Sequence, residues 1–213
     1  FRKPFEEFEI KNVSSLELEA LAIQYSFELP SNSKLRKLIQ NPFYLDEYLR
    51  SYSTDGNSAT YPQFKKGIWL RKIQNSTYTK DNIHLQREKC FLSIIQSRIE
   101  TGNFFVDASN CSDNTLALLT KDEIISFDKN SGGYFITHDI YEEWGQDVIV
   151  ERTFNSLENH KEFLLKIGST LPIRRTFRNW LSDKLHEKPQ EIKPFIEDCI
   201  VNPVIDSFWK DEI

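Results

Sequence analysis

The sequence predicts a mainly α-helical chain in which one small β-hairpin separates two groups of helices. Apolar residues recur at helical spacing through most of the chain, and capping residues precede several of these stretches. Strand-like apolar runs flank the turn sequence Lys129–Gly133. Glycine is scarce, at 7 residues, while aromatic residues make up 13 %, and both values suit packed helices better than a loop-rich scaffold.

The N-terminal part predicts a compact three-helix, lid-like domain over residues 1–53. Ser14 and Glu17 have the spacing of a capping box, and Pro30 is expected to end the helix that this box begins. The expected helices are Leu16–Phe27, Ser33–Gln40 and a third after Asn41-Pro42 that carries Leu45, Tyr48, Leu49 and Tyr52 on one face. The small polar residues of Ser51–Pro62 predict a linker after them.

Residues 54–153 predict a winged-helix domain with one β-hairpin. Helices are expected at Gln63–Ile73, at Ile83–Thr101 and, briefly, after Ser112, followed by the runs IISF and YFIT on either side of the turn KNSGG. Helices followed by a small hairpin are the element order of a winged helix. In the long helix, Phe91, Ile94, Ile95 and Ile99 are expected to form the buried face.

Residues 154–213 predict only helices, with prolines near their starts and short links between them. The expected helices are Leu157–Ile167, Pro172–Leu185, Pro189–Ile200 and Pro203–Ile213. Successive helices of this kind resemble the beginning of an α-solenoid. The third domain is therefore interpreted as the start of a superhelical region.

Composition narrows the class of protein. The net charge of −5 counts against a general polyanion-binding protein. Cys90, Cys111 and Cys199 are far apart and odd in number, which predicts reduced thiols that act as small apolar fillers in a cytoplasmic protein. No apolar run has the length of a membrane span, so no membrane contact is expected. Because the sequence lacks an initiating Met, it is expected to be part of a longer polypeptide.

The run Tyr134–Gly145 (YFITHDIYEEWG) is the most informative motif. A short strand is expected to deliver His138 and Asp139 to the first turn of an amphipathic helix, where an imidazole can meet a phosphate. The alternative is that these two residues only cap the helix. A metal or acid–base pair of His138 with Glu142 is disfavoured, because no second His or Cys is near in sequence. No G-x-x-x-x-G-K-[ST] occurs, so a nucleotide site would be incomplete in this chain.

Three segments, in order, resemble parts of the STAND class of P-loop ATPases, which includes the NACHT and NB-ARC groups. LRKLIQNPFYLDEYL resembles the segment of the helical lid in which a proline, here Pro42, sits against the adenine. FITHDIYEEWG resembles the MHD-type motif of the winged helix, with Thr137-His138-Asp139 as its core. LPIRRTFRNWLSDKL is similar to the Arg-rich helix that follows the winged helix in some bacterial members.

The resemblance implies a regulatory, conformational-switch region of a multidomain ATPase that contacts ADP or ATP, with Mg²⁺, in the intact parent. Pro42 and His138 would be the nucleotide-binding residues, the histidine contacting the β-phosphate of ADP in the closed state. The implied partners are a P-loop ATPase core in the same polypeptide and further copies in a homo-oligomer. Because the Walker strands are absent, no catalysis is expected of this chain itself. The sequence also departs from the motif at Thr137, which replaces the usual apolar residue before the histidine.

Two other classes remain open: a winged-helix DNA-binding regulator and a non-catalytic helical interaction module. The expected recognition helix, Asn114–Glu123, carries one lysine against two acidic residues, which is a poor reader of DNA. Arg174, Arg175 and Arg178 form a basic helix turn that is either an interaction cluster or a solvated face.

Overall fold

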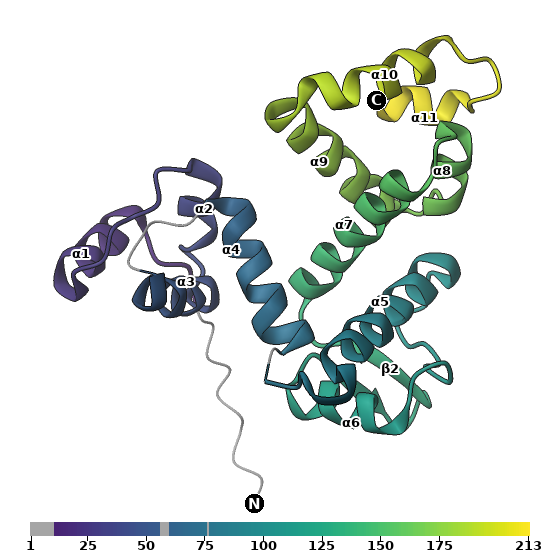
Figure 1. Cartoon of the computed structure of the whole chain (residues 1–213). Coiled ribbons are helices and arrows are strands. Elements are labelled where there is room, and N and C mark those ends of the chain that lie inside the picture. The colour runs from purple at the N-terminus through teal and green to yellow at the C-terminus, as the bar shows by residue number, and fades with distance from the viewer. Residues whose placement is uncertain (1–10, 56–59, 76) are drawn as a thin grey trace, which may run out of the picture. The chain divides into compact units, whose positions relative to one another are not determined.

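The chain is mainly helical, with a single hairpin among the residues described, as the sequence predicts. The computed structural model describes residues 11–55, 60–75 and 77–213 (Figure 1). Contacts divide the chain between Arg71 and Lys72 into two compact units. The predicted lid and winged-helix assignments are finer than this architecture and stay predictions.

The first unit holds four helices in the described residues: α1 (Ser15–Tyr25), α2 (Ser33–Leu38), α3 (Pro42–Asp55) and α4 (Tyr61–Ile68). The predicted capping box is confirmed, because the Glu17 amide donates to Ser14 Oγ at 3.3 Å and the Ser14 amide to Glu17 Oε2 at 2.8 Å. The buried side chains of this unit include Leu18, Phe27, Leu35, Ile39, Tyr48 and Phe64. Residues 1–10 of the first predicted domain lie outside the described residues.

The predicted linker begins too early. Helix α3 continues through Ser51 to Asp55, so the boundary predicted between residues 53 and 54 lies within a helix. The Ser51 hydroxyl donates to the Glu47 carbonyl at 2.9 Å, a hydrogen bond within the helix that lets a polar residue remain helical. Residues 56–59 of the predicted linker lie outside the described residues.

The second unit begins within a π-helical stretch, η1 (Trp69–Gln74). A 3₁₀ turn, η2 (Lys80–Asn82), then leads to α5 (Ile83–Thr101), α6 (Asp113–Lys121), β1 (Ile125–Asp128), β2 (Gly133–Ile136) and α7 (Asp139–Ser156). The predicted α5 bounds and its buried face are confirmed. The strands pair antiparallel with Ile125 opposite Ile136, and Val106 adds a single bridge to Tyr134.

Helix α7 connects the two halves of this unit (Figure 1): it contacts α5 and β2 as well as α8 and α9. Gly145 allows the close approach to α5, because a Cβ at that position would lie 1.9 Å from Ile95 Cδ1. Beyond this crossing, the buried Thr176 hydroxyl donates to Gln146 Oε1 at 2.8 Å and joins α9 to α7. Helix α7 is thus fixed on two sides.

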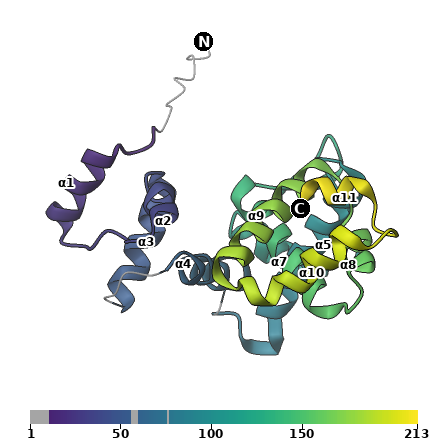
Figure 2. The same ribbon diagram turned by 90° about the horizontal axis from the view of Figure 1, so that it is seen from above.

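The last four helices are α8 (His160–Ile167), α9 (Leu171–Glu187), α10 (Pro189–Val201) and α11 (Ser207–Glu212). Helix α10 contacts both α8 and α9, and Figure 2 shows this group from above. Aromatic side chains dominate its core, with Phe154, Phe163, Phe177, Trp180 and Phe195 in mutual ring contact.

Two predicted helix starts are wrong. Helix α8 begins at His160, where Asn159 caps it, and not at Leu157. Helix α11 begins at Ser207 and not at Pro203, because Asp206 Oδ1 accepts from the Phe208 amide at 2.9 Å and sets the helix start there. The chain from Asn202 to Asp206 is consequently non-helical.

The cysteine prediction is wrong for two residues. Cys90 on α5 and Cys111 before α6 form a disulfide, with their Cα atoms 5.3 Å apart. Their separation of 21 residues in sequence concealed a pair that the fold brings together. Cys199 is unpaired and completely buried, as an apolar filler should be.

Membrane-spanning segments are absent from the described helices. None of them combines the length and the apolar composition that a span requires.

Candidate functional site

The structure places His138 at the N-cap position of the 18-residue helix α7, immediately after β2. Its side chain is exposed and makes no capping hydrogen bond to the helix. The imidazole packs edge-on against Tyr141, with ring centroids 5.5 Å apart. His138 therefore does not cap the helix through its side chain, whereas Asp139 lies in the first turn, as the alternative interpretation of these two residues expects.

Thr137 makes hydrogen bonds that an apolar side chain could not make. Its hydroxyl donates to the Ile124 carbonyl at 3.1 Å and to the Glu123 carbonyl, and its amide also donates to Ile124 at 3.2 Å. These bonds fasten the end of β2 to the turn after α6. They fix the backbone from which His138 projects.

Glu142 forms an ion pair with Arg98 and not with His138. Arg98 on α5 binds both oxygens of its carboxylate, at 2.9 Å and 2.8 Å, and also donates to the Phe104 carbonyl at 2.6 Å. A bidentate pair of this kind holds the carboxylate in a fixed orientation. This pairing agrees with the sequence-based argument against a His138–Glu142 metal or acid–base pair.

Pro42 is the first residue of α3 and is half-buried. The preceding Asn41 turns the chain, because its Oδ1 accepts from the Phe43 amide at 3.0 Å. Pro42 belongs to the first unit and His138 to the second. The two predicted nucleotide-binding residues therefore lie in separate compact units, and their joint contact with a nucleotide stays a prediction.

The three arginines of the predicted interaction cluster have different surroundings. Arg174 donates through Nε to Glu212 Oε1 at 2.9 Å, and Arg178 Nε lies 3.2 Å from Glu212 Oε2. The Arg174 guanidinium also lies over the Phe208 ring, 4.6 Å from its centroid. Two of the arginines thus hold α11 against α9, while Arg175 is exposed.

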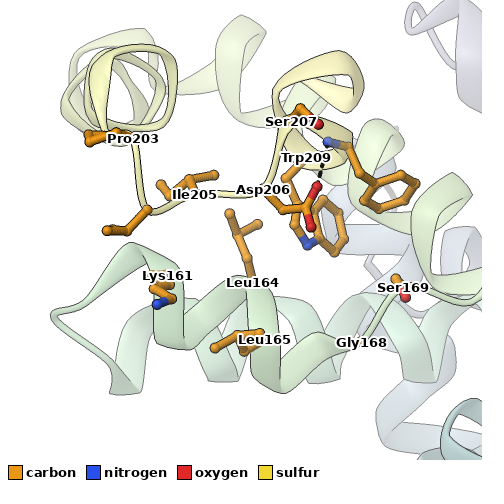
Figure 3. Close-up of a pocket in the computed structure, with 12 residues that line it drawn as sticks. Lys161, Leu164, Leu165, Gly168, Ser169, Pro203, Ile205, Asp206, Ser207 and Trp209 are labelled. Carbon is orange, nitrogen blue, oxygen red and sulfur yellow. Dashed lines mark hydrogen bonds between the residues drawn. The ribbon is translucent and has the colours of Figure 1, made fainter.

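A groove that the sequence analysis did not predict lies between α8 and the segment that leads into α11 (Figure 3). Its volume is about 690 Å³. One wall consists of the α8 face that carries Lys161, Leu164 and Leu165, which share a side because they are three and four residues apart. The other wall runs from Pro203 to Trp209.

The groove exists because α11 starts late. Residues 202–206 are not helical, and this stretch lies across the groove from Leu164 (Figure 3). Two features of the sequence indicate the late start of α11. Asn202 precedes a proline and is therefore biased away from helical conformation, and Asp206 is a favourable N-cap residue. The sequence does not show which residues of α8 face the groove, because tertiary packing decides this.

Elsewhere, one carboxylate has a strongly organised environment. Burial alone would raise the pKa of Glu151, but hydrogen bonds from Lys184, Trp180 and Asn155 outweigh it and lower that pKa. The Lys184 ammonium lies 2.7 Å and the Trp180 indole nitrogen 2.6 Å from this carboxylate. Glu151 is therefore a structural anion that joins α7 to α9.

Within the described residues, no group of three or more His, Cys, Asp or Glu side chains could hold a metal ion. A scan against models of known protein families gives no match for this chain, and a search of curated proteins gives none either.

Proposed function

We propose that this chain is the regulatory region of a multidomain STAND-type ATPase and acts as the moving part of a nucleotide-dependent switch. The observation that carries the proposal is the exposed His138 side chain, presented at the N-terminus of a long helix by a rigidly fastened hairpin. An imidazole there can donate to a phosphate, and the helix dipole favours the negative charge.

The connections of α7 support a switching role. The helix that begins beside His138 contacts α5 from Glu142 to Arg152 and contacts α9 through Gln146 and Glu151. In the proposal, a displacement at the phosphate would therefore reach the C-terminal helices. A ligand shifts such an equilibrium only by its different affinity for the two states. In the proposal ADP, held by Pro42 and His138, favours the closed state, and exchange for ATP with Mg²⁺ releases the region for homo-oligomerisation.

The proposal assigns nucleotide binding to the intact parent in the cytoplasm, together with its P-loop core, and no catalysis to this chain. The DNA-binding alternative is less well supported, because α6 carries Asp113 at its start and is followed by Asp122 and Glu123. Repulsion from phosphates disfavours DNA at such a helix.

The test is the nucleotide content of the parent polypeptide. His138→Ala should increase the rate of ADP loss about tenfold or more, because a charge-assisted hydrogen bond to a phosphate disappears. Bound nucleotide is measured by acid release and ion-exchange chromatography during dialysis. His186→Ala is the matched control, since it removes another exposed imidazole from the same unit.

Retention of ADP by the His138→Ala protein at the wild-type level would refute the sensor role. A parent polypeptide that contains no P-loop core and binds no nucleotide would overturn the whole proposal. Titration of duplex DNA, followed by anisotropy at low salt, then becomes the next experiment.

A further inference from the structure

The disulfide between Cys90 and Cys111 joins two residues that differ in exposure. Cys90 lies on the buried face of α5 and is only 5 % exposed. Cys111 is half-buried, in the non-helical chain that leads into α6. Thiol–disulfide exchange requires that the attacking thiolate reach one of the two sulfur atoms. Because Cys111 is the more accessible residue, an external thiolate is expected to attack its sulfur and not that of Cys90.

The connection between α5 and α6, residues 102–112, is anchored in its first half by contacts that do not involve the disulfide. The Phe104 carbonyl accepts a hydrogen bond from Arg98 on α5 at 2.6 Å. Val106 exchanges two backbone hydrogen bonds with Tyr134 on β2, at 3.0 Å and 2.9 Å. These contacts should hold the first half in place whether or not the disulfide is present.

The second half of this connection depends more on the disulfide. Ala108 is buried, and its carbonyl accepts from the Cys111 amide at 2.9 Å, which is a hydrogen bond within the segment itself. The two residues between them are exposed. The covalent bond to Cys90 fastens the end of the segment to α5, immediately before Ser112 caps α6. Loss of this bond would therefore loosen the end of the connection and the start of α6.

The structure also has a hydrogen-bond partner for the reduced form of Cys111. The Ser93 hydroxyl, one helical turn after Cys90, donates to the Cys90 carbonyl at 2.8 Å. The same Ser93 Oγ lies 3.5 Å from Cys111 Sγ. A Cys111 thiol can donate to this oxygen, which has lone pairs to accept it. Both oxidation states are thus compatible with the fold.

We propose that Cys90 and Cys111 form a reversible redox switch that exchanges with thiols of the glutathione class, and that Cys111 is the residue they attack. A glutathione thiolate forms a bond to Cys111 Sγ, and Cys90 leaves as a thiolate that takes a proton from water. A second glutathione thiolate attacks the glutathione sulfur of this mixed disulfide, which releases the Cys111 thiolate and glutathione disulfide. Two electrons thereby pass from two glutathione molecules to the protein pair, and the reverse steps restore the bond.

The inference rests on the proposed function for one point, the cytoplasmic location, because a disulfide in that compartment is usually transient, catalytic or redox-sensing. Its chemistry lies in this chain and requires neither His138 nor a nucleotide. An experiment on the chain alone therefore separates a failure of the switch from a failure of the nucleotide-dependent function.

The first measurement is a redox titration of the folded wild-type protein in glutathione buffers that cover the range of the cytoplasm. After an acid quench, the free cysteines are alkylated in denaturant and counted by mass spectrometry. The pair should change from oxidised to reduced within this series, without denaturant. In the reduced protein, amide hydrogen exchange of residues 107–112 should be faster by about tenfold or more, because this segment loses its covalent bond to α5. Exchange in α9 should stay the same.

Two variants locate the attacked sulfur. The Cys90→Ala protein, incubated with glutathione disulfide, should acquire one glutathione, on Cys111. The matched Cys111→Ala protein should acquire none under the same conditions, because its remaining cysteines, Cys90 and Cys199, are both buried. The circular dichroism spectrum checks that both variants fold, and the wild-type titration tests the switch even where one of them does not.

A pair that stays oxidised, or stays reduced, in every glutathione buffer would overturn the switch. Amide exchange of residues 107–112 that is equal in the two oxidation states would overturn its structural consequence. Glutathione uptake by the Cys111→Ala protein, at the level of the Cys90→Ala protein, would rule out Cys111 as the preferred point of attack.

Discussion

Arg87 is the residue on which the start of the second unit depends most. Its side chain is completely buried and donates to the carbonyls of Ile73 and Lys72, both at 3.0 Å. It also pairs with Asp122 at 2.9 Å and lies over the Tyr78 ring. Burial lowers the pKa of Arg87, and the Asp122 carboxylate opposes that shift. The Arg87 guanidinium thus supplies hydrogen bonds to two carbonyls at the end of η1 and joins η1 to Asp122 in the turn after α6.

Arg87→Met should destabilise the second unit by about 3 kcal/mol, because it leaves the carbonyls of Lys72 and Ile73 without their donor and removes the cation beside Asp122, which keeps only neutral help from Asn75. The urea midpoint, monitored by circular dichroism, measures the loss. Lys193→Ala is the control, since its pair with Glu197 is 64 % exposed on both sides and should leave the midpoint unchanged. Adding Asp122→Asn to Arg87→Met should recover part of the loss. A midpoint equal to that of the control would contradict this account.

Among the elements, the crossing of α5 and α7 is the closest contact that the described glycines reveal. Gly145 is buried there, and the Ile95 and Phe91 side chains occupy the space that a larger residue would need. Such a crossing fixes the distance between the two helices. It also explains why a glycine is present in the interior of a helix, where it is otherwise unfavourable.

Gly145→Ala should destabilise the protein by about 1–3 kcal/mol although alanine is the better helix former, because the new methyl group overlaps Ile95 Cδ1. Thermal unfolding measures the change. Ile95→Val removes the overlapping atom, so the double variant should be more stable than Gly145→Ala alone. A stability gain for Gly145→Ala on its own would show that the helices separate without cost.

On the scale of the whole molecule, the cysteine pairing bears on where the protein resides. The Cys90–Cys111 bond joins α5 to the segment before α6. Disulfides persist mainly in oxidising compartments, whereas the proposed function places the protein in the cytoplasm. The oxidation state of this pair in freshly extracted protein therefore tests the compartment as well as the bond.

Thiol titration after denaturation should count one thiol in the unreduced protein and three after reduction. In the folded, unreduced protein no thiol should react with the titrating reagent. Burial raises the pKa of Cys199 to about 12 and so removes the reactive thiolate. Reduction should cost about 3 kcal/mol of stability, as expected for a loop of this length. The Cys199→Ala protein is the control, and it should show no free thiol when it is denatured without reduction. Three alkylated cysteines per chain, counted by mass spectrometry in extracts denatured and alkylated without reduction, would restore the original prediction of reduced cysteines.

The sequence by itself determined most of the secondary structure. Caps and apolar periodicity act over a few residues, so the capping box at Ser14, the full length of α5 and the hairpin around Lys129–Gly133 were all predicted correctly. The strand-to-helix junction at His138 was predicted for the same reason, since a strand followed by a helix start is a local pattern. What these local signals share is that both partners of each interaction lie close together in the chain.

Only the tertiary structure decided the features that join distant residues. The Cys90–Cys111 bond, the pair of Arg87 with Asp122 and the pair of Arg174 with Glu212 each bring together side chains more than twenty residues apart. The groove at Trp209 arises in the same way, from a non-helical stretch packed over α8. Periodicity shows which face of a helix is buried but not what covers it, because many packings bury the same apolar surface.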